Sequence, residues 1–177
     1  AVVNHLTPRP FPGSTVVQLN GAANAFDSGT LYSDSIISTL ATAFDASAVH
    51  FPVPAFFDFV ETKAALAKER SIRRVQDVID SCDIALFGIG AMDPTMPSHV
   101  YAGGCLSSAE LRQAREDGIV GDVCTVLIRA DGSTDTPLNA RASGPTPDRL
   151  KKIPKRLCVV SGSAKVCALL GALRAGV

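Results

Sequence analysis

The chain has 177 residues, and its 17 lysine and arginine residues balance its 17 aspartate and glutamate residues, so its formal net charge is zero. This balance argues against electrostatic capture of nucleic acid or an anionic membrane, and 46% hydrophobic with 19% charged residues excludes a disordered chain. No apolar stretch approaches the roughly 18 residues of a membrane span, no signal-peptide layout opens the chain, and the five cysteines form no CxxC pair that would indicate zinc or disulfides.

The order of apolar residues predicts alternating strands and helices in one domain, residues 1–177. In the first half, an apolar run ends at Asn20-Gly21, and three prolines within residues 7–13 exclude a helix there. The expected elements of this half are a helix end at 1–6, strands at 15–20 and 48–51, and helices at 29–44, 61–68 and 71–81.

In the second half, the continuous apolar run 84–87 predicts a strand that is buried on both faces of a parallel sheet. It opens into Gly88-Ile-Gly90 and a long loop. Ser107 and Glu110 form the pattern of a helix capping box. The remaining expected elements are a helix at 107–117, a strand at 123–129 turned by Asp131-Gly132, a loop or edge strand at 136–147, a short helix at 146–152, a strand at 156–160 and a helix at 166–174.

Strands that alternate with helices indicate an α/β fold, with a mainly parallel, Rossmann-like sheet and helices on both faces. In such folds ligands bind at the carboxyl ends of the strands. Three loops follow expected strands and should meet there: Asn20-Gly21, Gly88-Ile-Gly90 and the loop at 161–165.

The loop at 161–165 has the composition of an anion site. The first backbone N–H groups of a helix lack internal partners, and the helix dipole is positive at that end. Serine hydroxyls and one ammonium would add further donors. The candidate phosphate-binding residues are Ser161, Gly162, Ser163, Ala164 and Lys165. The alternative is a plain strand-to-helix turn with a solvated lysine.

Other polar groups are weaker candidates. Gly88-Ile-Gly90 would let a ligand approach the backbone, but Asp93 stands where a dinucleotide fingerprint has glycine. Asp122 would bind a sugar hydroxyl or cap a turn. Basic residues between 63 and 74 alternate with acids, which favours a solvated helix face. Histidines at ligand spacing, a GxSxG elbow and a Cys/His pair are all missing, so we expect no cofactor, no metal and no nucleophilic catalysis.

Several segments together resemble the effector-binding domain of SorC/DeoR-type bacterial transcriptional regulators. Their order and spacing match over nearly the whole chain. They are VVQLNG (16–21), LFGIG (86–90), GCLSSAEL (104–111), GIVGD (118–122), ADG (130–132), VVSGSAK (159–165) and ALLGALR (168–174). The resemblance implies a fold related to glucosamine-6-phosphate deaminase, ribose-5-phosphate isomerase and CoA transferases. It also implies a phosphorylated sugar effector without catalysis, and assembly as a homodimer or homotetramer.

The resemblance also implies roles for single residues. The family's sugar-phosphate lysine falls on Lys165, and Ser163 and Ala164 would hold the phosphate beside it. The expected sugar-binding residues are Asn20, Gly21, Tyr32, Ser33, Asp34, Gly88, Gly90, Asp93 and Asp122. Residues 32–34 would set sugar identity, or they form an ordinary helix start.

Departures from the family refine these expectations. Some members have arginine where Asn20 stands and glutamate where Ala91 stands, so we expect a monophosphate. The family's first strand and phosphate loop would precede Ala1, and its last strand would follow Val177. Flanking segments and an N-terminal DNA-binding module are therefore expected outside residues 1–177, with DNA contacted only through that module.

Two other functions stay open. An isomerase or deaminase of the same fold would need a general base beside the anion, for which Asp93 and Asp122 are the nearby candidates. An oligomerisation module would bind no ligand.

Overall fold

The computed structural model describes residues 2–22, 29–93, 98–102 and 104–177; for 29–34, 99 and 102 it describes the backbone only. The strands are β1 (Thr15–Val17), β2 (Ser47–Val49), β3 (Ile84–Ala91), β4 (Ile119–Val123), β5 (Val126–Arg129) and β6 (Lys155–Val159). The helices are α1 (Gly29–Phe44), α2 (Val60–Leu66), α3 (Arg70–Asp80), α4 (His99–Ala102), α5 (Ser108–Glu116), α6 (Pro147–Leu150) and α7 (Val166–Arg174), with 3-10 turns η1 (Val2–His5), η2 (Pro137–Ala140) and η3 (Ser163–Lys165).

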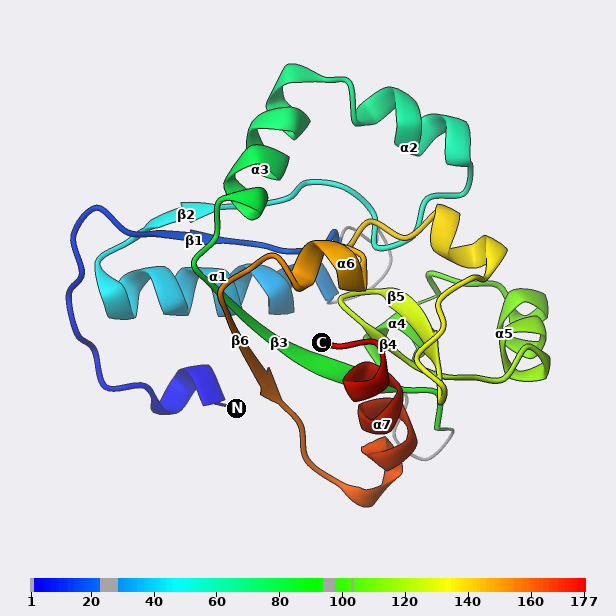
Figure 1. Cartoon of the computed structure of the whole chain (residues 1–177). Helices are drawn as coiled ribbons and strands as arrows, with labels where there is room; N and C mark the ends of the chain where they lie inside the picture. The colour runs from blue at the N-terminus through cyan, green and yellow to red at the C-terminus, as the bar shows by residue number, and fades with distance from the viewer. Residues whose placement is uncertain (1, 23–28, 94–97, 103) are drawn as a thin grey trace.

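The described strands form two sheets, and neither direction of pairing dominates. β1 and β2 pair in parallel, and a four-stranded sheet has the order β5-β4-β3-β6 (Figure 1). Within it, β3 and β6 are parallel, whereas β3–β4 and β4–β5 are antiparallel. The α/β class is confirmed, but the prediction of a mainly parallel sheet is wrong for this part of the chain, because the β4–β5 hairpin adds two antiparallel pairs.

β3 is longer than predicted and is covered on one face. Gly88 and Gly90 belong to the strand and not to a loop. Ala85, Phe87 and Ile89 are buried, whereas Ile84 and Leu86 are 52% and 39% exposed. The apolar run does not mark burial on both faces, because side chains alternate along a strand and α7 packs beside the buried set. β6 is exposed along its whole length. At β5, however, Ile128 packs with α7, whereas Leu127 packs with α4 and α5. Because successive side chains of a strand point to opposite faces, the described helices cover both faces of this part of the sheet.

The hairpin of β4 and β5 corrects the predicted strand at 123–129. The chain turns at Cys124 and Thr125, whose φ angles of 49° and 74° are those of a tight turn with two left-handed residues. Asp131-Gly132 follows β5 and closes only a local turn. Gly121 sits inside β4, where a Cβ would lie 2.2 Å from the carbonyl oxygen of Gly90. Glycine at this position reflects close packing between β4 and β3 and does not mark a loop.

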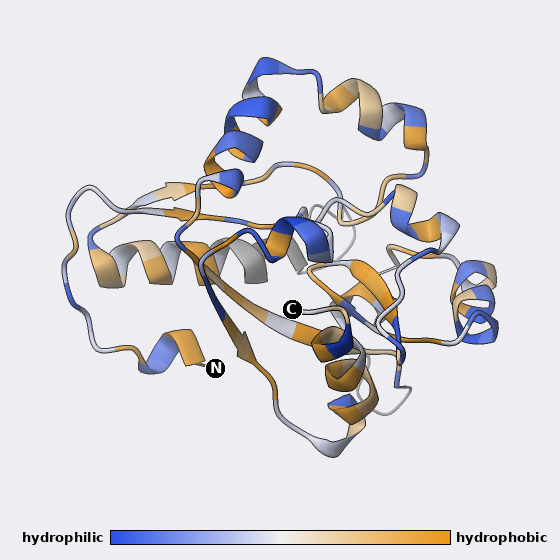
Figure 2. Cartoon of the chain, viewed as in Figure 1, coloured by the Kyte–Doolittle hydropathy of each residue, from blue (hydrophilic) through white to orange (hydrophobic). Residues whose placement is uncertain are grey.

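Three clusters of buried side chains form the core. One packs β3 and β4 against α7, a second packs β4 and β5 against α4 and α5, and a third joins the β1–β2 region to α3. Figure 2 shows β5 and α7 as largely apolar. Among the described helices, none has the length and apolarity to cross a bilayer.

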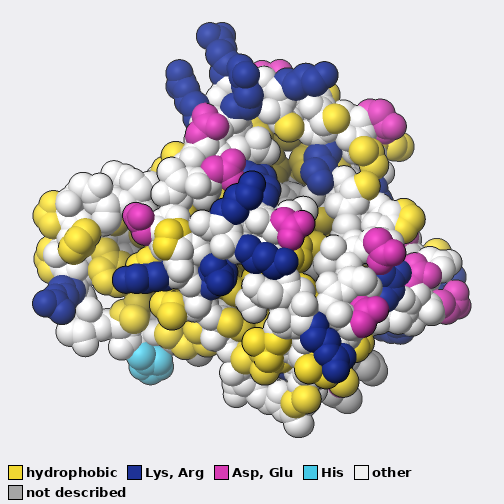
Figure 3. Space-filling view, in the orientation of Figure 1, with side chains coloured by type: hydrophobic (Ala, Val, Ile, Leu, Met, Phe, Trp, Pro, Cys, Tyr) yellow, Lys and Arg dark blue, Asp and Glu magenta, His cyan; other side chains and the backbone are white. Residues whose placement is uncertain are grey.

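The basic run between 63 and 74 lies on α2 and α3. Arg70, Arg73 and Arg74 are exposed, and Figure 3 shows acidic side chains among the basic ones over these helices. Lys63 donates to the carbonyl oxygen of Ala140 at 3.0 Å, and burial lowers the pKa of its ammonium. The prediction of a solvated face holds for the three arginines.

Candidate functional site

The loop at 161–165 connects β6 to α7 as the sequence predicts. Gly162 has a φ of 99°, a left-handed conformation that favours glycine, and η3 then leads into α7. Ser161, Gly162 and Ser163 are exposed, whereas Ala164 and Lys165 are half-buried. The loop therefore presents its hydroxyls and early backbone amides to solvent at the start of a nine-residue helix.

The ammonium of Lys165 does not extend into solvent. Its Nζ donates to the carbonyl oxygen of Ile89 at 2.7 Å, across 76 positions of sequence. Ile89 lies between Gly88 and Gly90, so the ammonium is fixed beside the glycine segment of β3. This contact shows that the lysine is not merely solvated, and it ties the loop at 161–165 to the glycine segment of β3.

The two glycines of β3 differ in their surroundings. Gly88 is exposed, and an added Cβ would meet only the Val159 carbonyl oxygen, at 3.4 Å. Gly90 pairs with Asp122 of β4, and an added Cβ would lie 1.9 Å from Asp122 Oδ1 and 2.8 Å from Ser98 Oγ. Gly88 thus leaves open space above the strand, whereas Gly90 leaves the room that the Asp122 carboxyl group fills.

Asp122 is a buried strand residue with 5% exposure. Its Oδ2 accepts a hydrogen bond from Thr125 N at 3.2 Å, which ties it to the hairpin turn. Burial raises the pKa of Asp122; the hydrogen bond from Thr125, the neighbouring Tyr101 hydroxyl and the positive charge of Lys165 act in the opposite direction. Asp122 and Lys165 are therefore close enough for their charges to interact.

Tyr101 of α4 faces the same carboxyl group. Its hydroxyl is buried, and its pKa is raised by burial and by the negative charge of Asp122. Within the described residues, neither the Tyr101 hydroxyl nor Asp122 Oδ1 has a partner in good hydrogen-bond geometry. Of these two residues, Asp122 also interacts with the positive charge of Lys165.

The Asn20-Gly21 loop is tied to this region through residues that sequence reasoning missed. Gly21 N donates to Ser143 Oγ at 3.0 Å, and the next residue, Gly144, donates from its N to Thr125 Oγ1 at 3.1 Å. Thr125 is the residue that caps Asp122. Asn20 Nδ2 donates to the carbonyl oxygen of Gly21 at 2.9 Å, so its side chain folds onto the backbone of the next residue.

The structure thus brings together Lys165, Gly88, Gly90 and Asp122, and it joins Asn20-Gly21 to them through hydrogen bonds. Asp93 follows the end of β3 by two residues. Tyr32, Ser33 and Asp34 lie in α1, but their side chains are outside the described part. The missed residues are Ser98, Tyr101, Thr125 and Ser143. Each lies in a stretch without hydrophobic periodicity or at a turn, so no local signal identified it.

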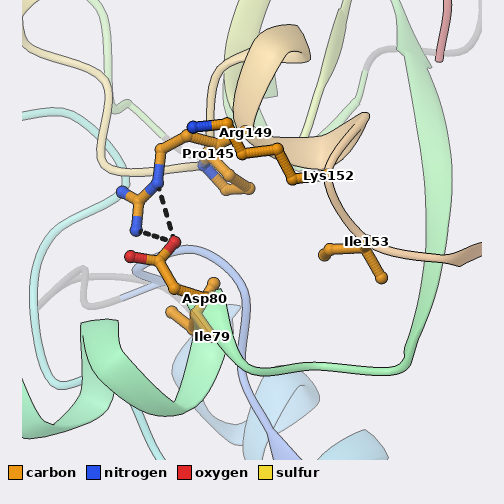
Figure 4. A pocket seen from close by; sticks show the side chains of 6 residues that line it. All are labelled: Ile79, Asp80, Pro145, Arg149, Lys152 and Ile153. Carbon is orange, nitrogen blue, oxygen red and sulfur yellow. Dashed lines mark hydrogen bonds and ion pairs between the residues drawn. The ribbon is translucent and has the colours of Figure 1, made fainter.

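A hollow of about 350 Å³ lies elsewhere, between the end of α3 and α6 (Figure 4). Across it, Arg149 donates from Nε and Nη2 to Asp80 Oδ1 at 3.1 and 2.6 Å. The lining residues are Ile79, Asp80, Pro145, Arg149, Lys152 and Ile153. The hollow includes no predicted site residue, and its ion pair fastens α3 to α6. No cluster of metal-ligating side chains occurs among the described residues.

Comparisons with known proteins match this chain to a sugar-binding domain family and to transcriptional regulators. The family model described as "Putative sugar-binding domain" matches residues 1–177. The deoxyribonucleoside regulator of Bacillus subtilis is 28% identical over 97% of this chain and 54% of its own length. The transcriptional regulator LsrR of Klebsiella pneumoniae is 30% identical over 69% of this chain and 38% of its own. The chain therefore spans about half, or less, of these relatives.

Two solved structures are similar in fold and sequence. A domain of a "possible sugar-binding transcriptional regulator" from Arthrobacter aurescens has a TM-score of 0.90 and 46% identity, covering 99% of this chain and 67% of that one. A DeoR family transcriptional regulator from Listeria monocytogenes has a TM-score of 0.84 and 27% identity, covering 98% and 67%. These relatives are regulators, not enzymes.

Proposed function

The chain belongs to this family of sugar-binding domains of transcriptional regulators, and we propose that it senses a phosphorylated sugar for a cytoplasmic regulator. The observation that carries the proposal is the bond of Lys165 Nζ to the Ile89 carbonyl oxygen at 2.7 Å. It places a positive charge where the exposed loop at 161–165 meets the open backbone of Gly88. A phosphate on the loop and a sugar over β3 would then be neighbours.

The phosphate would be bound by the loop amides together with Lys165. The amide of Lys165 is already used by the carbonyl oxygen of Gly162 at 3.2 Å, so the amides of Gly162, Ser163 and Ala164 are the donors we assign. Ser161 and Ser163 add hydroxyls, and both are exposed. A helix start with a left-handed glycine before it concentrates backbone N–H groups on one anion.

The sugar would lie over Gly88 and extend to the edge of Gly90, where the Asp122 carboxyl group fills the space above the strand. Asn20, Gly21 and Asp93 would lie at its edges and residues 32–34 at its far end. Asp122 is only 5% exposed, so it would contact the sugar only through a hydroxyl group that enters the space over Gly90. A single phosphate fits better than two. Asn20 is a neutral amide bonded to the Gly21 carbonyl oxygen, and Ala91 is a buried, uncharged residue, so neither position offers positive charge to a second phosphate.

Isothermal calorimetry on the full-length regulator tests the proposal, with pentose and hexose phosphates and the matching free sugars as ligands. A charge-assisted hydrogen bond is worth about 1.5–3 kcal/mol. Lys165→Ala should therefore weaken binding of the phosphorylated effector roughly tenfold to a hundredfold. Lys155→Ala is the matched control, because Lys155 is an exposed lysine at the opposite end of β6. Unchanged effector affinity in Lys165→Ala would contradict the assignment.

Further proposals concern the whole protein. We propose a homodimer or homotetramer that contacts DNA only through a module outside residues 1–177, with the fold of glucosamine-6-phosphate deaminase and its relatives. The parallel pairs β1–β2 and β3–β6 support that fold. Light scattering on the full-length regulator tests the assembly, and an experimental structure of the longer protein tests the fold.

A further inference from the structure

Asp122, Tyr101 and Lys165 form a cluster whose polar groups are not all matched. Asp122 Oδ2 is bonded by Thr125 N at 3.2 Å, but Oδ1, seated over Gly90, has no partner in good geometry among the described residues. The Tyr101 hydroxyl is buried and equally unmatched. The Tyr101 and Ser98 hydroxyl groups are the neighbouring donors, but neither reaches Oδ1 in good hydrogen-bond geometry, and burying a carboxylate oxygen in this way is costly. The nearby ammonium of Lys165 is the positive charge that offsets this cost in the absence of a ligand.

An anion bound at the loop 161–165 would change the electrostatic environment of Asp122. It would bind the same ammonium and bring negative charge towards a carboxylate that is removed from solvent, where charges interact more strongly than in water. The unmatched Oδ1 is the atom at which a proton would relieve the repulsion. The O–H formed there would have two oxygen atoms close by, the Tyr101 hydroxyl and Ser98 Oγ.

We propose that an anionic ligand binding at the loop 161–165 is accompanied by uptake of a proton on Asp122 Oδ1. The inference rests on the anion site proposed above and deepens it: Asp122 is a positioning residue that acts on the ligand through Lys165, in place of the direct hydroxyl contact that the sequence predicts. The raised pKa of Asp122 supports this, because a carboxyl group that is already costly to ionise takes up a proton readily.

The other titratable groups around Asp122 can be separated from it. Tyr101 has a raised pKa, and burial raises the pKa of Cys124 to about 12, so neither changes its charge between neutral and mildly acidic pH. Lys165 supplies the positive charge. Asp93 and His99 lie on the segment between β3 and the start of α4, so Asp93→Asn and His99→Gln are needed as controls.

Sulfate is the probe, because it stays a dianion throughout this pH range and cannot itself take up the proton. Calorimetry of sulfate binding to the full-length regulator, in two buffers of different ionisation enthalpy, counts the protons exchanged. Wild-type protein should take up protons, and its sulfate affinity should rise as pH falls, by up to about tenfold per pH unit. Asp122→Asn should bind sulfate with no proton uptake and a flat pH profile, while the exposed control Asp148→Asn should behave as wild type.

Tyr101→Phe keeps the ring and removes the hydroxyl that favours ionised Asp122, so the pH dependence should move to higher pH. A purely structural Asp122 would leave the proton count unchanged in Asp122→Asn. Wild-type protein that binds sulfate through Lys165 without proton uptake overturns this inference and leaves the anion site intact. Sulfate binding that Lys165→Ala does not weaken, or no saturable binding, overturns the anion site and the inference together. The wild-type measurements decide even where a variant fails to fold.

Discussion

Replacing Gly90 with alanine should lower stability, whereas replacing Gly88 should weaken ligand binding, although the two glycines lie in one strand. A Cβ at Gly90 would lie 1.9 Å from Asp122 Oδ1 and 2.8 Å from Ser98 Oγ. The carboxyl group would have to move, and its bond from Thr125 N would be lost. At Gly88 an added Cβ would meet only a carbonyl oxygen at 3.4 Å, an ordinary contact distance.

The magnitude follows from these contacts. Overpacking a core costs about 1–3 kcal/mol, a lost hydrogen bond costs about 0.5–1.5 kcal/mol, and replacing glycine by alanine returns about 0.4–1 kcal/mol of unfolded-state entropy. Gly90→Ala should therefore lower the free energy of unfolding by about 1–3 kcal/mol. Gly88→Ala should change it by less than about 0.5 kcal/mol, yet it should weaken binding of a sugar phosphate, since its methyl group enters the space above β3.

Urea denaturation measures the first effect, and calorimetry with the effector measures the second. The slope of the denaturation curve should stay constant, so that a change of midpoint reports stability. Equal stability of the two variants would refute the role given to Gly90 in seating Asp122. A Gly88→Ala variant with unchanged effector affinity would refute the placement of the sugar over Gly88.

Four further predictions concern other parts of the chain. Burial would raise the pKa of Glu110, but hydrogen bonds from Ser107 and Arg141 outweigh this effect and lower the pKa. The ionised carboxylate therefore stabilises the fold at neutral pH, and this stabilisation is lost as pH falls below the ordinary carboxyl range. Urea denaturation at several pH values should show that the free energy of unfolding falls less on acidification in Glu110→Gln than in the wild type. Arg141→Ala, which removes the ion pair to Glu110 and a bond to the Phe57 carbonyl oxygen, should cost about 1–3 kcal/mol in the same assay. The chain alone should not shift DNA in a gel at low salt, because it has no net charge. Alanine variants of residues 32–34 should change the ranking of sugar phosphates in a thermal-shift screen; an identical ranking would make these residues structural.

Signals that are local in sequence predicted the fold best. The apolar spacing of 29–44 and of 166–174 gives the bounds of α1 and α7 as observed. The capping box is confirmed by both of its bonds, from Glu110 N to Ser107 Oγ at 3.2 Å and from Ser107 N to Glu110 Oε2 at 2.7 Å. Such features depend on residues three or four positions apart, which a single sequence displays directly.

Glycines led to wrong predictions where glycine is required by packing between segments that are distant in sequence. The expected strand at 123–129 leaves Gly121 outside it, yet Gly121 lies in β4. Glycine is required there because a Cβ would meet the Gly90 carbonyl oxygen at 2.2 Å and Ala168 Cβ at 2.6 Å. The true turn, Cys124-Thr125, contains neither glycine nor asparagine. Turn rules favour those residues at left-handed positions, so Asp131-Gly132 is a stronger turn signal than the residues of the observed hairpin.

In the candidate site too, the types of residue could be predicted from the sequence, but their contact partners could not. The lysine and serines of the loop were identifiable from composition, but the acceptor of Lys165 lies 76 positions away and the partner of Gly21 lies 122 positions away. Tyr101 carries no pattern that distinguishes it from a core aromatic. Its relation to Asp122 depends on how α4 packs against β4, which is set by the assembled core.

The pairing register of β3 and β6 is what makes one site out of the separate candidates. In this parallel pair Gly88 is level with Val159, so the chain leaves β6 beside the open glycine and reaches the loop at 161–165 within two residues. Lys165 can then return its ammonium to Ile89, the next residue along β3. A slip of one residue would turn the side chains of β6 to opposite faces and move the loop away from Gly88. The antiparallel pairing with β4 places Asp122 opposite Gly90, which follows Ile89 on β3. β3 therefore fixes the distance between the buried Asp122 carboxylate and any anion that Lys165 binds.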